Sequence, residues 1–225
     1  MATGHELTDH ARQMQQLYRR EVFTFDYTRV PVLLGRRRLR GLVPTGARVL
    51  EVGCGTGGNL HRLHAAVGPS GEVIGVECAP AMWARARRRA GPGIQVQLAD
   101  YVGGPLQSDT PVALRPDVVV FSYSLSMIPD FGAALDRAWE SLRPGGRIVV
   151  LDFLDSGLGP VRRRLGRYGV ESGEARRRWL RHRGQVIEDR EFRAWGGAWT
   201  YYLIAAAKPA VPTPGPTVPA APRSG

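Results

Sequence analysis

Residues 49–59, VLEVGCGTGGN, decide the fold of this chain, because they join a short apolar strand to a glycine-rich turn that opens a helix. Glycine tolerates positive φ angles and lets a ligand approach the backbone closely, while the helix N-terminus supplies free N–H donors. Gly53, Gly55 and Gly58 also satisfy the GxGxxG pattern of dinucleotide-binding folds, although that spacing alone is a weak signal. The stretch therefore predicts a nucleotide-like ligand at the end of a strand.

Outward from this stretch, short apolar strands alternate with helical segments. The chain passes through NLHRLHAAV, EVIGVE, PAMWARARRRA and IQVQLAD, and resumes with PDVVVFSYS, FGAALDRAWESL and GGRIVVLDF. Such alternation predicts an α/β fold in which a mostly parallel sheet carries helices on both faces. QVIEDREF and AWTYYLIAA, on either side of residues 195–197, predict a closing antiparallel hairpin.

The pattern divides the chain into regions. Residues 1–44 are expected to form an N-terminal helical cap, whose first helix begins at Thr8 or Asp9. Residues 45–208 form the α/β domain, interrupted by an Arg-rich insert at 154–184. The Pro- and Ala-rich tail, residues 209–225, is expected to be disordered because it contains almost nothing that can pack.

Charge is the unusual feature of the composition. Lys and Arg number 31 against 20 Asp and Glu, a net charge of +11, and every cation except Lys208 is arginine. A charge of this size favours nucleic acid, anionic lipid or acidic substrates without choosing between them, and the clusters can equally be solvated faces. The chain shows neither a spanning apolar run nor a secretory signal, so we expect a cytoplasmic protein with Cys54 and Cys78 reduced.

Acidic residues at strand ends favour S-adenosyl-L-methionine over NAD as the ligand. Glu51 would repel a pyrophosphate on the glycine turn, but it suits a ligand with a sulfonium and an ammonium group. Glu77 can accept both ribose hydroxyls, as in NAD enzymes, while Asp100 and Tyr101 can take the adenine amino group and stack on the base. Each acid could instead be an ordinary surface or capping carboxylate. The expected donor-binding residues are Glu51, Gly53, Gly55, Gly57, Glu77, Asp100, Tyr101 and Ser122.

Residues 45–207 resemble the class I S-adenosylmethionine-dependent methyltransferases. EVGCGTG at 51–57 is similar to their first motif, and LRPGGRIVVLDF at 142–153, followed by a hairpin, is similar to the end of their sheet. The resemblance implies a Rossmann-like seven-stranded sheet in the order 3-2-1-4-5-7-6, with strand 7 antiparallel and helices on both faces.

Further segments resemble the bacterial diacylglyceryl-homoserine N-methyltransferases, which build a betaine lipid by successive N-methylations. FDYTR at 25–29 and LLGR at 33–36 are similar to the N-terminal pattern of that family, and SYSLSMIP at 122–129 is similar to its motif after the fourth strand. Phe25 stands where that family has tyrosine, so one possible hydroxyl contact is lost. The Arg-rich insert also departs from the family, so the resemblance does not define which surface faces the lipid. The resemblance implies a lipid amine substrate.

The chemistry of amine methylation suggests residue roles. Displacement at an activated sulfonium needs positioning and an unprotonated nitrogen more than a strong base. Arg29 is the candidate for holding the homoserine carboxylate through parallel hydrogen bonds, with Arg193 next. Tyr27 and Tyr123 would orient the amine and, with Tyr18, stabilise the methylated cation, unless these rings are core or cap packing. No His/Cys/Asp cluster has metal-ligand spacing, so no metal is expected.

A diacyl substrate cannot leave the bilayer at low cost, so we expect peripheral binding to an anionic membrane. The candidate clusters are Arg36, Arg37, Arg38 and Arg40 beside Leu33, Leu34, Leu39 and Leu42, and Arg162–Arg164 with Arg176–Arg178 beside Trp179 and Leu180. Three alternatives stay open. A soluble natural-product N- or O-methyltransferase would keep the same donor site. A nucleic-acid methyltransferase is disfavoured, because SYSLS replaces the Asn/Asp-Pro-Pro-aromatic motif. A non-enzymatic subunit would bind the donor without turnover.

Overall fold

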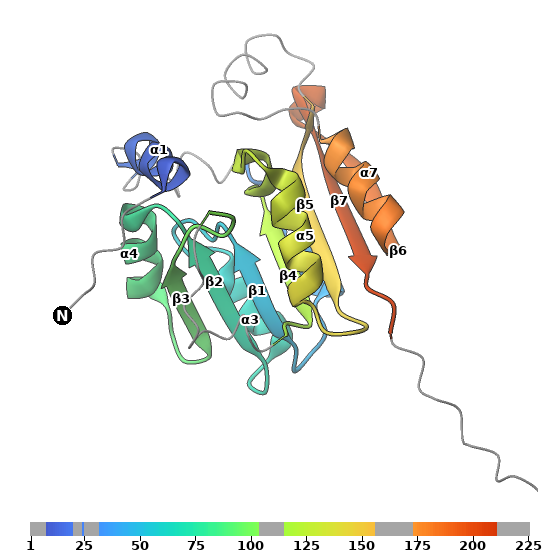
Figure 1. Cartoon of the computed structure of the whole chain (residues 1–225), viewed down its shortest axis with the longest axis horizontal. Helices are drawn as coiled ribbons and strands as arrows, with labels where there is room; N and C mark the ends of the chain where they lie inside the picture. Colours follow the sequence, from blue (N-terminus) through green and yellow to red (C-terminus); the bar gives the residue numbers. More distant parts are fainter. Residues whose placement is uncertain (1–7, 20–23, 25–31, 104–114, 156–172, 211–225) are drawn as a thin grey trace, which may run out of the picture.

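The computed structural model describes residues 8–19, 24, 32–103, 115–155 and 173–210. They form a seven-stranded sheet in the order β3-β2-β1-β4-β5-β7-β6 (Figure 1). Neighbouring strands from β3 to β5 pair in parallel, and β7 runs antiparallel to both β5 and β6, so the predicted order and the reversed strand are confirmed. The strands are β1 (Arg48–Val52), β2 (Glu72–Glu77), β3 (Ile94–Leu98), β4 (Val118–Ser122), β5 (Arg147–Asp155), β6 (Gln185–Ala194) and β7 (Trp199–Ala207).

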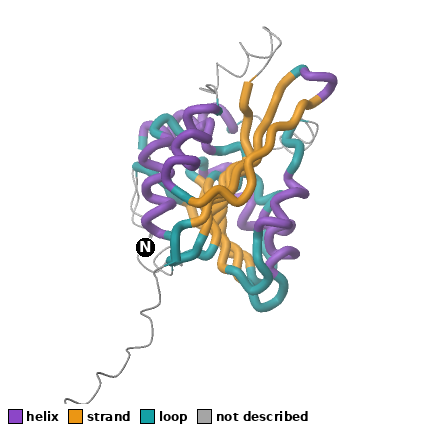
Figure 2. The backbone as a smooth tube through the Cα atoms, turned by 90° about the vertical axis from the view of Figure 1, so that its right-hand side faces the viewer, coloured by secondary structure: helices purple, strands orange, loops and turns teal. Residues whose placement is uncertain are grey.

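Helices cover both faces of this sheet (Figure 2). One face carries α3 (Leu60–Val67), α4 (Pro80–Arg89) and the 3-10 helix η1 (Arg36–Leu42), and the other carries α5 (Phe131–Ser141) and α7 (Glu174–Arg183). Successive side chains of a strand point to opposite faces, so each strand contributes to two cores. In β1, Val49 packs on the side of α3 and Leu50 on the side of α5.

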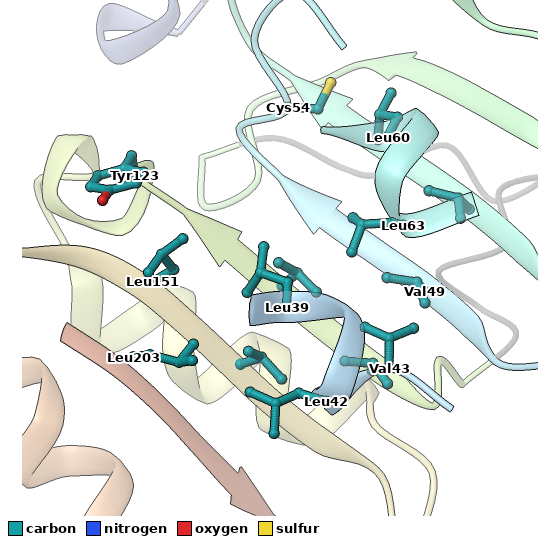
Figure 3. Close-up of a cluster of buried hydrophobic side chains, with 14 of the residues drawn as sticks. Leu39, Leu42, Val43, Val49, Cys54, Leu60, Leu63, Tyr123, Leu151 and Leu203 are labelled. Carbon is teal, nitrogen blue, oxygen red and sulfur yellow. The ribbon is translucent and has the colours of Figure 1, made fainter. Parts of the chain in front are cut away.

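The 3-10 helix η1 separates its side chains by a period of three residues. Such a helix places residues i and i+3 on one side. Leu39 and Leu42 share the inner side and are buried in the same cluster as Val49 (Figure 3). Arg37 and Arg40 share another side and are exposed. The expectation that Leu39 and Leu42 face a membrane is therefore wrong, because they fill the core beneath η1.

Helix α7 occupies residues 174–183, which the sequence reading had assigned to the Arg-rich insert. Arg176 and Arg177 are buried on it. The Arg177 guanidinium forms ion pairs with Glu174, Asp189 and Glu191, which tie α7 to β6. Of the three α7 arginines that were expected at a membrane, two are thus used inside the fold, and only Arg178 is exposed. Arg162–Arg164 lie outside the described residues.

The N-terminal helix α1 (Asp9–Tyr18) begins where predicted, with the Thr8 hydroxyl accepting a hydrogen bond from the Ala11 N–H at 3.1 Å. It lies beside α4 (Figure 1), and Met14 packs with residues at the start of α4. Gln15 Oε1 accepts a hydrogen bond from the Ala81 N–H at 3.2 Å. The helix is therefore held against the carboxyl-end edge of β2 and β3 by few contacts.

The strands β6 and β7 form the predicted hairpin, turned by η4 (Trp195–Gly197). Near the other end of β7, the Lys208 ammonium donates hydrogen bonds to the carbonyl oxygens of Trp139 and Leu142 at 2.7 and 3.2 Å, which ties the strand to the C-terminus of α5. Within the described part of the chain, no helix is long and apolar enough to cross a membrane. The tail from residue 211 onward lies outside the described residues.

Candidate active site

A pocket lies at the carboxyl ends of β1, β2 and β4, beneath α1. In an open α/β sheet ligands bind at this end, where the strand order reverses, and here the reversal falls between β1 and β4. Residues from α1, the glycine turn and the segment after β4 meet around it. Its described lining includes His10, Met14, Tyr18, Leu33, Arg36, Gly53, Gly55, Glu77, Asp100, Tyr101, Ser122, Tyr123, Met127, Ile128 and Phe153.

The glycine turn of residues 53–58 forms one wall. Gly53 has a φ of +70°, and a Cβ there would lie 2.5 Å from the Ser124 Cβ, so the turn can approach the segment after β4 only without a side chain. Gly55 also lines the pocket. Gly57, also predicted to bind the donor, instead faces α4, where a Cβ would lie 3.2 Å from Ala86.

Glu77 ends β2 inside the pocket, as predicted. Its side chain is only 7% exposed, and its two oxygens accept hydrogen bonds from the backbone N–H groups of Ala79 at 2.9 Å and Gly55 at 2.8 Å. Burial raises the pKa of this carboxyl, and the bonds from the backbone partly oppose that rise. The carboxylate is thus fixed between the glycine turn and the start of α4.

Glu51 lies behind the glycine turn. It is 1% exposed, and its Oε1 accepts a hydrogen bond from Asn59 Nδ2 at 2.8 Å, while its Oε2 is buried without a hydrogen-bond partner. Burial raises its pKa to about 7, against the lowering effect of the Arg36 charge and the Asn59 bond. A buried carboxylate with an unused oxygen favours a cation beside it.

Asp100 and Tyr101 line the pocket from the end of β3. Asp100 accepts hydrogen bonds from the Thr8 hydroxyl and from the backbone N–H groups of Val102 and Gly103. Partial burial opposes its charge, but these bonds outweigh burial and lower its pKa. Tyr101 packs edge-on against Phe121, with ring centroids 6.2 Å apart. Asp100 therefore also holds the N-terminus of α1, a role that the sequence did not indicate.

The segment after β4 forms the opposite wall and contains η3 (Leu125–Met127). Tyr123 has a φ of 58°, and its hydroxyl donates to the Leu34 carbonyl at 2.7 Å, so it presents its ring rather than its hydroxyl to the pocket. Tyr18 lines the pocket from α1. Tyr27 and Arg29, the other predicted acceptor residues, lie outside the described residues. Arg193 is exposed on β6, away from the described lining.

Arg36 is a pocket residue that the sequence reading placed on the surface. It shares the inner side of η1 with Leu39 and Leu42, and its Nε donates to the Ser122 hydroxyl at 3.0 Å. The three-residue period of RRRLRGL would have identified it as inward-facing, had η1 been recognised as a 3-10 helix. Arg36 therefore brings a positive charge to the boundary between the glycine turn and the segment after β4.

Asp152 was also missed. It is fully buried in β5, where it accepts hydrogen bonds at 2.8 Å from the Ser126 N–H, the Ser126 hydroxyl and the Phe153 N–H. Burial raises its pKa, and the bonds from Ser126 partly lower it. An acid inside the apolar run IVVLDF was the available signal. Through Ser126, Asp152 anchors η3 and the pocket wall that follows.

Residues 13–205 match the family model described as a methyltransferase domain. The chain belongs to the class I S-adenosylmethionine-dependent methyltransferases. The chain is 39% identical over 107 residues to an uncharacterised protein of transposon Tn4556 from Streptomyces fradiae. It is 33% identical over 151 residues to aklanonic acid methyltransferase DauC from Streptomyces sp. (strain C5). These matches cover 47% and 63% of this chain, and 30% and 66% of the relatives' lengths.

Among solved structures, the methyltransferase is similar to phosphoethanolamine N-methyltransferase 2 of Haemonchus contortus in complex with S-adenosyl-L-methionine. The TM-score is 0.66 at 14% identity, and the match covers 90% of this chain and 60% of that chain. At this identity the likeness concerns the fold. The residues at the pocket fit the donor on independent grounds: the glycine turn leaves room for a ligand and Glu77 can face hydroxyls. Glu51 does not line the pocket itself, but its unused oxygen, behind the glycine turn, suits a cation.

Proposed function

We propose that this methyltransferase methylates the amine of a diacylglyceryl-homoserine lipid, on the way to a betaine lipid. The observation that carries the proposal is Arg36, a guanidinium on the pocket wall, bonded to Ser122 at the start of the SYSLSMIP segment. A guanidinium matches the geometry of a carboxylate, and the homoserine headgroup carries a carboxylate beside its amine. We assign Arg36 to that carboxylate, together with the sequence candidate Arg29.

The remainder of this wall suits the product of the reaction. Tyr18, Tyr123 and Phe153 supply aromatic rings, and Met127 and Ile128 supply apolar surface. Aromatic faces attract a methylated ammonium by about 0.5 to 2 kcal/mol each. The donor supplies a methyl group on a positively charged sulfur. The residues of the pocket therefore have to orient the acceptor nitrogen and exclude water, and a strong base is not required.

The test is to incubate the purified protein with isotopically labelled donor and diacylglyceryl-homoserine, and to measure the mass of the lipid by mass spectrometry. A stepwise gain of methyl masses on the lipid is expected. The conservative variant Arg36→Lys should reduce kcat/KM for the lipid by about 10-fold or more, because an ammonium cannot form paired bonds to a carboxylate. Its affinity for S-adenosylhomocysteine, measured by calorimetry, should change little. Unmodified lipid at full donor occupancy would refute the proposal.

A second candidate is a soluble natural-product N- or O-methyltransferase. It is favoured by the similarity to aklanonic acid methyltransferase, a relative that matches 63% of this chain. The same labelled donor distinguishes the two, if the lipid and aklanonic acid, the compound in that relative's name, compete in one reaction. Methyl transfer to aklanonic acid alone would select this second candidate.

A further inference from the structure

Four arginines form an exposed cluster next to the pocket, which we call the arginine face: Arg37, Arg38, Arg40 and Arg190. Arg37 and Arg40 lie one turn apart on the outer side of η1. Arg38 and Arg190 both lie over the Phe192 ring, at 4.2 and 5.5 Å from its centroid, so η1 and β6 meet at this ring. Residues 32–43, which supply three of the four arginines, contain no acidic side chain, and the acids on either side of Arg190, Asp189 and Glu191, form ion pairs with Arg177 of α7.

The arginine face connects through packed rings to the pocket wall that follows β4, which we call the acceptor wall and which contains Tyr123, Met127 and Ile128. Phe192 stacks on Tyr201, with centroids 5.0 Å apart and planes at 22°. Tyr201 in turn lies 6.4 Å from Tyr123, which lines the pocket. Arg36, one residue before Arg37, lies inside the same pocket. A molecule whose head occupies the acceptor wall would therefore leave the protein close to these arginines.

The tip of the β6–β7 hairpin lies at the end of the sheet where the pocket is found. In the sheet, Thr200 pairs with Asp155 at the carboxyl end of β5 and with Arg193 of β6, so η4 lies beyond the strand ends that form the pocket. Trp195 on η4 is 65% exposed, the most exposed large hydrophobic side chain among the described residues. Tryptophan favours the headgroup level of a bilayer.

We propose that the arginine face and Trp195 dock this methyltransferase on an anionic bilayer. The charge of the face complements anionic headgroups, Trp195 supplies an interfacial anchor, and the stacked rings of Phe192 and Tyr201 link the face to the pocket residue Tyr123. The proposal extends the proposed function, because a diacyl acceptor stays in the membrane and the enzyme has to reach it there. It assigns docking to a surface other than the α7 arginines, of which Arg176 and Arg177 are buried.

The test is co-sedimentation of the full chain with phosphatidylcholine vesicles, with and without phosphatidylglycerol, at low and high salt. Wild type should bind only the anionic vesicles, and salt should release it. Each engaged arginine contributes about 5-fold to partitioning, so the variant Arg37→Gln/Arg40→Gln/Arg190→Gln should bind about 100-fold more weakly. Trp195→Ala should weaken binding as well. Arg38 stays unchanged because its guanidinium lies closer to the Phe192 ring than that of Arg190, at 4.2 Å against 5.5 Å from the centroid.

A matched control removes the same charge elsewhere. Arg87→Gln/Arg88→Gln/Arg178→Gln replaces three exposed arginines of α4 and α7 and should bind nearly as wild type does. Equal losses in the two triple variants, or no binding of wild type at low salt, would overturn the proposal, as would retention on RNA without vesicle binding. Methylation of glyceryl-homoserine, which lacks acyl chains, tests the proposed function separately, and the docking variant should retain it.

Discussion

Glu51 combines a stability cost with a proposed role in donor binding. Its carboxyl has a pKa of about 7 in the folded protein, against an ordinary 4.5, because burial disfavours the charge. The folded state therefore holds this proton more tightly than the unfolded state, and stability falls as the pH rises from 4.5 to 7. We expect Glu51→Gln, which keeps the bond from Asn59, to raise the free energy of unfolding above pH 7 by up to about 3 kcal/mol. Urea denaturation on both sides of this pH window measures the gain, which should vanish below pH 4.5. Donor affinity should fall about 10-fold in the same variant, because a neutral amide cannot balance a cation. Equal stability of the two proteins above pH 7 would mean that the carboxylate is buried at no cost.

At the scale of elements, η3 depends on Asp152. Ser126→Ala removes one of three donors to a fully buried carboxylate, which should lower stability by about 1–3 kcal/mol. Because η3 carries Met127 and precedes Ile128, both on the pocket wall, KM for the acceptor should rise while donor affinity is retained. Denaturation, acceptor kinetics and donor calorimetry on one preparation give these quantities. Ser70→Ala is the control, since Ser70 is exposed in the turn before β2 and is not among the residues that line the pocket. Similar acceptor kinetics in the two variants would argue against an anchoring role for Asp152.

The elements differ in how far the sequence could predict them. Strand periodicity and the glycine turn determine the sheet, because local patterns report burial. The same local patterns also place Glu77 at the end of a strand, beside the pocket. Arg36 and Arg177 could not be placed in this way, since an arginine run looks solvated until its partners on other elements are known. These partners are the Ser122 hydroxyl for Arg36, and Asp189 and Glu191 for Arg177. Asp152 was hidden for the same reason, because its partner Ser126 lies on another element.

Across the whole molecule, α1 is an outer layer made of one short helix. It meets the described remainder through Met14, with Leu17 and Tyr18 partly buried beside it, the Gln15 bond to Ala81 and the Thr8 bond to Asp100. Elements with few buried contacts open at low free energy. We expect the amides of α1 to exchange hydrogen faster than those of α5, and to slow when S-adenosylhomocysteine fills the pocket that α1 lines. Mass-spectrometric hydrogen exchange measures both rates. Unchanged exchange in α1 with bound ligand would show that this helix does not contact the donor.

The position of Lys208 has a practical consequence for chemical labelling. It is the one lysine in 225 residues, and its amine already donates to two carbonyl oxygens at the end of α5. Succinimidyl esters attack an amine with a free electron pair, so this side chain should acylate slowly while the junction of α5 and β7 stays closed. Acylation of Lys208, read on its own peptide by mass spectrometry so that reaction of the terminal α-amine is kept apart, would then report the opening of that junction.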